Sequence, residues 1–141
     1  MLRFRGNPAL SPFRSEKLLA ALRRRVPVVT AVHAEFAHFL DGSPTAPERE
    51  VLERLLEYGP AAARRHPGGA PLFLVVPRPG TISPWSSKAT DIARNCGLHR
   101  VRRIERGVAY HVDAARPLTD RELVELKPLL HDRMTEAVLG P

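Results

Sequence analysis

The chain has 141 residues, of which 43% are hydrophobic, and a formal net charge of +7. Its length predicts one domain with a hydrophobic core of its own. No apolar run reaches the ~18 residues of a membrane-spanning helix, no secretory signal opens the chain, and one cysteine excludes an internal disulfide. We therefore expect a cytoplasmic protein that has no membrane partner.

The positive charge comes mostly from arginine, which supplies 19 of the 22 basic residues. These arginines are dispersed, and only Arg23–Arg25 and Arg100–Arg106 form clusters. A nucleic-acid-binding surface concentrates its basic residues on one face or along one helix. We therefore expect solvated surface arginines and no nucleic-acid partner. Binding of nucleic acid through Arg100–Arg106 is a less favoured interpretation.

The sequence resembles itself when it is shifted by 72 residues. Ser11-Pro12-Phe13 then aligns with Ser83-Pro84-Trp85, and Asp41 aligns with Asp113. Each half contains a short strand, a helix, a long extended segment and a second helix. This pattern predicts an α+β domain built from two β-α-β-β-α or β-α-β-α units, residues 1–65 and 70–141, with the boundary in Ala61–Ala70. We expect each unit to form a small sheet with helices on one face, and the two sheets to pack as a pseudo-twofold pair.

Four helix starts carry local capping signals. The two Ser-Pro pairs place a capping hydroxyl before a proline in the first turn. Thr45 with Glu48 and Thr119 with Glu122 form capping boxes. Each start is followed by an apolar stripe: Leu18, Leu19, Leu22 and Val26; Val51, Leu52, Leu55 and Leu56; Ala89, Ile92, Ala93 and Cys96; and Leu123, Leu126, Leu130 and Met134. Gly59-Pro60 should end the second helix, and Gly97 should end the third. Pro128 lies inside the fourth helix and should kink or split it.

Three segments read as strands. Residues 28–40 and 101–112 alternate between apolar and polar side chains, as half-buried strands do. The second of these contains Arg106-Gly107, which predicts a tight turn or a bulge. Residues 72–76 are apolar throughout, which predicts a central strand buried on both faces.

The reactive residue types do not form a catalytic pattern. Cys96 falls at the end of a predicted helix, where the dipole disfavours a thiolate, so we expect a small buried apolar residue. The six histidines lack metal-site spacing, and His33 and His38 should point to opposite faces of a strand. No glycine-rich phosphate loop is present, and Trp85 takes the serine position of a Ser-x-x-Lys motif. We expect no catalytic residue, no metal and no cofactor in this chain.

The run PRPGTISPWSSKATDIARNCGL, residues 77–98, gathers hydroxyls, a lysine and the only tryptophan at one helix start. Free amides and the helix dipole favour an anion at such a position. Its hydroxyls are explained equally by a capped helix with surface serines and by contact with a phosphate or a partner loop. The candidate contact residues are Arg78, Thr81, Ser83, Trp85, Ser86, Ser87, Lys88 and Asp91.

The same run closely resembles the N-terminal domain of large phosphoribosylformylglycinamidine synthases, and residues 100–112 and 130–136 extend the match. Residues 2–20, 33–41 and 52–60 fit as well. The resemblance implies a domain shaped like a fused dimer of the small PurS subunit. It also implies a place in an enzyme that uses ATP, magnesium and glutamine to convert formylglycinamide ribonucleotide to its amidine.

In that family, the partners of this domain are the linker, synthetase and glutaminase domains of the same polypeptide. The chain contains neither a Cys-His-Glu glutaminase constellation nor a synthetase-like ATP site, so we expect an excised, noncatalytic domain. Residues 78–91 should form its contact surface, with Trp85 as an anchor that is dispensable for folding. The alternative is a free-standing PurS-like assembly subunit or a small anion-binding protein.

Overall fold

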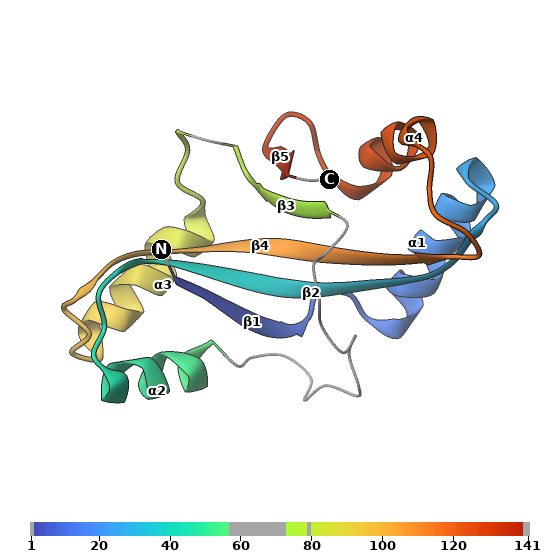
Figure 1. The fold of residues 1–141 in the computed structure, drawn as a ribbon. Helices are drawn as coiled ribbons and strands as arrows, with labels where there is room; N and C mark the ends of the chain where they lie inside the picture. The colour runs from blue at the N-terminus through green and yellow to red at the C-terminus, as the bar shows by residue number, and fades with distance from the viewer. Residues whose placement is uncertain (1, 57–72, 79, 140–141) are drawn as a thin grey trace.

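The computed structural model describes residues 2–56, 73–78 and 80–139, and within them four helices lie against one antiparallel sheet (Figure 1). The predicted α+β class is confirmed. None of the described helices is long and apolar enough to cross a membrane. In chain order the elements are β1 (Leu2–Pro8), α1 (Pro12–Arg25), β2 (Val29–Gly42), α2 (Ala46–Leu55), β3 (Phe73–Pro77), α3 (Pro84–Asn95), β4 (Val101–Ala114), α4 (Asp120–Leu130) and β5 (Glu136–Leu139).

The sheet has the order β1-β2-β4-β3-β5, and the long strands β2 and β4 pair along its centre. Phe36 of β2 lies opposite Val108 of β4, and these two residues are counterparts at the 72-residue shift. An antiparallel strand meets its own copy at the same position only on a twofold axis. The register therefore has the pseudo-twofold relation that the sequence predicted. The two halves share one sheet, however, and the expectation of two packed sheets is corrected, because β2 and β4 satisfy each other's edges.

All four helices cover the same face of this sheet. Val32 and Ala34 belong to the apolar cluster under α1 and α4, and Leu40 belongs to the cluster under α2 and α3. These three residues alternate along β2, so they point to one face. The helix layer therefore consists of two pairs over one continuous sheet, with one core under each pair.

The four capping hydroxyls act as predicted. Ser11, Thr45, Ser83 and Thr119 each accept a hydrogen bond from the backbone amide three residues later, and both capping boxes are present. Arg116 strengthens the last box, since its hydrogen bonds to Glu122 are the main cause that lowers the pKa of that carboxyl to about 2. The starts of the helices thus follow from short-range hydrogen bonding alone.

Other predictions need correction. β4 runs straight through Arg106-Gly107, where the absent side chain of Gly107 leaves room for the Val75 carbonyl, 2.7 Å from where a Cβ would lie. β3 is not buried on both faces, because helices cover only one face: Phe73 and Val75 are buried, while Leu74 is half-buried.

α4 continues through Pro128 and ends two residues later, because a proline in the last turn removes only one hydrogen bond. Met134 therefore lies beyond α4, with 80% of its surface exposed. α2 ends at Leu55, and the predicted stop at Gly59-Pro60 and the boundary in Ala61–Ala70 lie outside the described residues.

Candidate functional site

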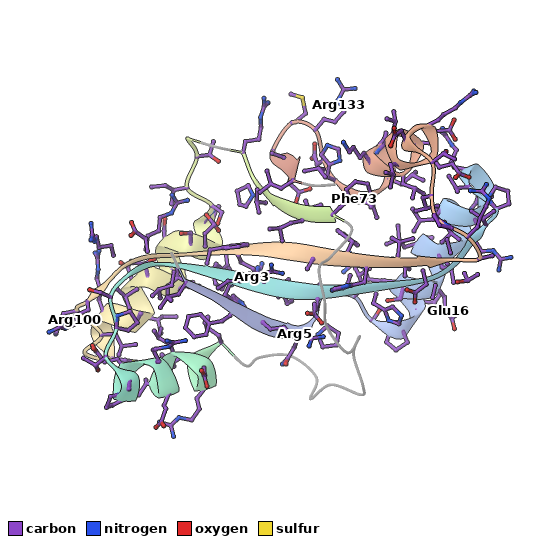
Figure 2. The ribbon with its side chains drawn as sticks, viewed as in Figure 1. Arg3, Arg5, Glu16, Phe73, Arg100 and Arg133 are labelled. Carbon is purple, nitrogen blue, oxygen red and sulfur yellow. The ribbon has the colours of Figure 1, made fainter. Side chains whose placement is uncertain are left out.

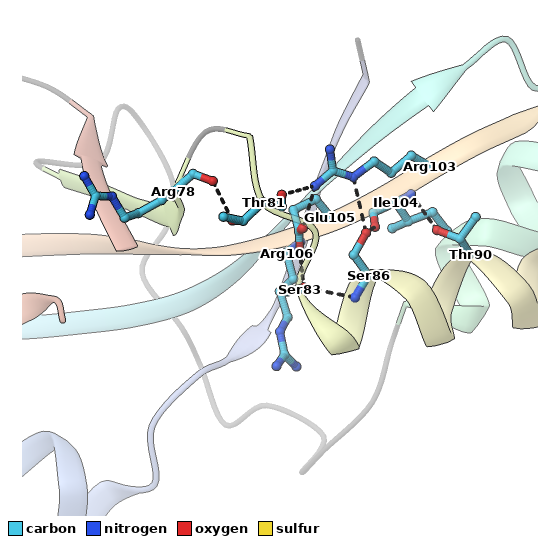
Figure 3. A network of polar contacts seen from close by, with 9 residues as sticks. All are labelled: Arg78, Thr81, Ser83, Ser86, Thr90, Arg103, Ile104, Glu105 and Arg106. Atoms are coloured by element: carbon cyan, nitrogen blue, oxygen red, sulfur yellow. Dashed lines mark hydrogen bonds and ion pairs between the residues drawn. The ribbon is translucent and has the colours of Figure 1, made fainter. Parts of the chain in front are cut away.

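Helix α3 lies along an edge of β4 that no described strand covers. β3 pairs with β4 only from Val108 to Tyr110, so the backbone groups of Ile104 face α3 instead. The Ser86 hydroxyl donates a hydrogen bond to the Ile104 carbonyl, and Thr90 Oγ1 accepts one from the Ile104 amide at 3.1 Å (Figure 3). Ser86 is completely buried. These two hydroxyls therefore do for β4 what a neighbouring strand would do.

Side chains also satisfy the positions on either side of Ile104. Arg94 Nη2 donates to the Arg102 carbonyl at 3.1 Å, and the Arg106 amide donates to Glu105 Oε1 at 2.9 Å. Alternate residues of a strand present their backbone groups to the same edge. The edge of β4 before Val108 is thus closed by α3 and by Glu105.

Glu105 occupies the start of α3. Its carboxylate accepts hydrogen bonds from the Ser83 hydroxyl at 2.8 Å, from Arg103 Nη2 at 2.9 Å and from the Arg106 amide (Figure 3). α3 has no acidic residue in its first turn, so Glu105 supplies the negative charge that the helix dipole favours. A carboxylate of the chain itself therefore lies at this helix start.

The loop before α3 is tied to the same group. Arg103 Nη2 donates to the Thr81 carbonyl at 3.1 Å, and the Thr81 hydroxyl donates to the Arg78 carbonyl at 2.6 Å. Arg78 and Thr81 also line a cavity of about 360 Å³ on the helix-free face of the sheet, with Phe39 and Val76 in its apolar part. The loop is positioned by β4 and leaves the Arg78 side chain exposed.

Trp85 belongs to the fold. Its half-buried ring packs against the cluster under α2 and α3 and lies 5.5 Å from the ring of His38. The Arg106 guanidinium lies 4.8 Å from the Trp85 ring centroid and 4.5 Å from that of Phe36. Cation–π contacts of this kind are stabilising. Part of the Trp85 ring is therefore engaged within the domain, and unfolding of a Trp85 variant will show whether folding depends on it.

His38 is the titratable group under Trp85. It is completely buried, and burial, followed by the charge of Arg106, lowers its pKa to about 4. The imidazole is therefore neutral at physiological pH. As predicted, His33 lies on the other face of β2, where its Nε2 is 3.6 Å from Asp113.

The predicted apolar stripe of α3 is buried only in part, at Ala93 and, to a lesser degree, Ala89. The buried residues are Ser86, Thr90 and Ala93, whereas Ile92 and Cys96 are exposed. The inner face of α3 carries Ser86 and Thr90 because it also meets backbone groups at the edge of β4. The expectation that Cys96 is buried is wrong, and this cysteine caps the C-terminus of α3 at the surface.

The candidate contact residues thus separate into two groups. Ser83, Trp85 and Ser86 are engaged within the domain. The exposed group consists of Arg78, Thr81, Ser87, Lys88 and Asp91. In the described part of the chain, no three His, Cys, Asp or Glu residues are grouped so that they would hold a metal ion.

Basic side chains are spread over the surface. Arg3, Arg100 and Arg133 are exposed and lie well apart in Figure 2. Within the predicted Arg100–Arg106 cluster, Arg103 and Arg106 interact with groups of the domain, as described above. The arginines therefore do not form one continuous exposed patch along β4.

Comparison with known families matches residues 35–141 to the family described as "Formylglycinamide ribonucleotide amidotransferase N-terminal". The matched part contains α3, the loop before it and all of β4. It covers well over half of the chain. The chain therefore belongs to the N-terminal domain family of formylglycinamide ribonucleotide amidotransferase, an enzyme of purine biosynthesis.

Proposed function

We propose that this chain is a noncatalytic structural and coupling domain, which holds the synthetase and glutaminase domains of the amidotransferase in their working arrangement. The complete enzyme would use ATP, magnesium and glutamine to convert the amide of formylglycinamide ribonucleotide into an amidine. ATP, magnesium and both catalytic sites would belong to the other domains. The role of this chain is then to position the other domains, and it does so through the residues on its surface.

The observation that carries this proposal is that polar groups around α3 are hydrogen-bonded to other groups of the domain. A serine nucleophile needs a base whose lone pairs are available. The Ser83 hydroxyl does contact Glu105, but the same carboxylate also accepts hydrogen bonds from Arg103 and from the Arg106 amide. Ser86 is buried against a backbone carbonyl. These contacts support a scaffold rather than a reaction centre.

The alternative of an anion-binding protein is less well supported. An anion at the start of α3 would have to displace Glu105 from the Ser83 hydroxyl or approach beside its charge. Like charges at such a short distance repel each other. We therefore assign the exposed residues Arg78, Ser87, Lys88 and Asp91 to protein contacts within the enzyme.

Complementation tests this function. The 141-residue chain is added to the enzyme polypeptide that lacks its first domain, and amidation is measured with glutamine and separately with free ammonia. We expect the chain to restore the glutamine-dependent reaction. The double variant Arg78→Glu/Lys88→Glu should restore less, whereas Arg133→Glu, exposed in another part of the surface (Figure 2), should act like the unchanged chain. Failure of the unchanged chain to restore activity would contradict the proposal.

A further inference from the structure

The two helix pairs, which the pseudo-twofold axis relates, are not closed to the same degree. α1 and α4 contact each other directly, and no comparable contact joins α3 and α2. α2 and α3 lie at the end of the sheet opposite α1 and α4 (Figure 1). Within the described residues, α1 and α4 therefore close their side of the helix layer, and α2 and α3 leave a gap between them.

This gap is an apolar groove of about 160 Å³. The described side chains that line it are all apolar, and they include Leu52, Leu55, Ala89, Ile92 and Ala93. Leu52 and Ala93 form part of the buried core, while Leu55 and Ile92 stand at the rim with 40% and 49% of their surface exposed. Small-molecule sites usually measure about 300–1,000 Å³, so this groove is of a size for one large side chain.

The rim of the groove also carries a charge. Lys88 precedes Ile92 by one helical turn, so the two side chains lie next to each other on α3. Lys88 is exposed and makes no hydrogen bond or ion pair with any residue in the described ranges. The chain as a whole carries a net charge of +7. An apolar side chain flanked by a carboxylate complements both the groove and its rim.

We propose that the groove between α2 and α3 binds an acidic amphipathic segment from the catalytic part of the same enzyme. The segment inserts one large aliphatic or aromatic side chain between Leu55 and Ile92 and places a carboxylate beside Lys88. Amphipathic helices commonly dock into hydrophobic grooves in this way. The inference rests on the proposed coupling function and deepens it, since it names the surface and the chemistry of the partner.

A binding titration tests the inference. The 141-residue chain is titrated against the separately expressed remainder of the enzyme. We expect Leu55→Ser and Ile92→Ser each to raise the dissociation constant by about tenfold or more, as the loss of an interface anchor does. Val124→Ser is the matched control, because Val124 is 64% exposed on α4 of the other pair, and it should change binding by less than about twofold. Lys88→Glu, an exposed change that cannot empty the core, should weaken binding most at low salt.

The outcomes separate the two proposals. If the unchanged chain binds and both serine variants bind equally well, the groove inference is overturned and the coupling function stands. A large drop in the melting temperature of the serine variants would also overturn it, because the chain itself would then be filling the groove. Dimerisation of the unchanged chain that Ile92→Ser abolishes would assign the groove to a second copy instead. If the unchanged chain does not bind at all, both proposals fail.

Discussion

The starts of α1 and α3 are alike in sequence and different in surroundings. Both begin with a capping serine, a proline and an aromatic residue. Phe13 is 72% exposed, whereas Trp85 is half-buried against His38 and Arg106. The difference arises from the neighbouring strand, since α3 must close the edge of β4 while the start of α1 has no such task. Similar local signals therefore began one helix that packs on the face of the sheet and one that also closes the edge of a strand.

Removing the aromatic side chain at each start should give the largest contrast. Trp85→Ala empties packing space over the cluster under α2 and α3 and should destabilise the domain by about 3 kcal/mol. Phe13→Ala removes an exposed ring and should change the free energy of unfolding by less than about 0.5 kcal/mol. Denaturant unfolding of both variants measures the difference. Equal effects would show that the two starts are equivalent after all.

The pH dependence of stability should differ between His38 and its counterpart at the 72-residue shift, Tyr110. The folded chain keeps His38 neutral with a pKa of about 4, while the unfolded chain binds a proton near pH 6.5. Stability contributed by neutral His38 is thus present above pH 6.5 and is lost as the pH falls from 6.5 towards 4, by up to about 3 kcal/mol. Burial raises the pKa of Tyr110, so its contribution is lost only as the pH rises above about 10.

Urea unfolding between pH 4 and 8 measures how the free energy of unfolding falls on the acid side. His38→Phe should flatten the curve between pH 6.5 and 4 relative to the unchanged chain, whatever its effect on stability at pH 7. His33→Phe, on the other face of β2, is the control and should leave most of the slope in place. A slope that His38→Phe does not alter would contradict the burial of a neutral imidazole.

Replacing a hydroxyl on the inner face of α3 with an aliphatic side chain, as α1 has, should break the hydrogen bond to β4. Thr90 aligns with Leu18 at the 72-residue shift, and Thr90→Val keeps its volume while removing the partner of the Ile104 amide. An unsatisfied buried amide costs about 1–3 kcal/mol. Thr90→Ser retains the hydroxyl and should lose less. Thermal unfolding that ranks the two variants in the opposite order would argue against the edge contact.

The smallest difference in the free energy of unfolding should be the one between variants of the two capping serines. Ser11→Ala removes one cap and should cost about 1 kcal/mol. Ser83→Ala removes a cap and also a hydrogen bond to the largely buried Glu105, so we expect about 1 kcal/mol more. Chemical unfolding of the two variants side by side checks this, and equal losses would mean that Glu105 does not depend on Ser83.

The sequence allowed the helix starts to be predicted because each cap is formed within three residues. It also revealed the duplication that the pairing of Phe36 with Val108 reproduces. The buried face of α3 was predicted correctly at Ala89 and Ala93 and wrongly at Ile92 and Cys96, since apolar periodicity assumes that a buried face is apolar. Ser86 and Thr90 are buried because they serve backbone groups of Ile104, which is 18 and 14 residues away. No local pattern announces such a partner.

Glu105 illustrates the same limit at the candidate site. It was not among the candidate residues, yet it contacts Ser83 over a separation of 22 residues and orients Arg103. An acidic residue in a strand has no local signature of a helix cap. The first turns of α3 and α1 both lack an acidic residue, so the local sequence does not show which helix start a distant carboxylate will reach.

Hydrogen exchange at the Ile104 amide tests most directly whether α3 replaces a strand at the edge of β4. We expect slow exchange in the unchanged chain, comparable with that of Val108, and exchange about tenfold or more faster in Thr90→Val than in Thr90→Ser. Free exchange of the Ile104 amide in the unchanged chain, at the rate of a solvent-exposed loop, would contradict it. In that case the hydroxyls of α3 would again be available for a partner or a reaction.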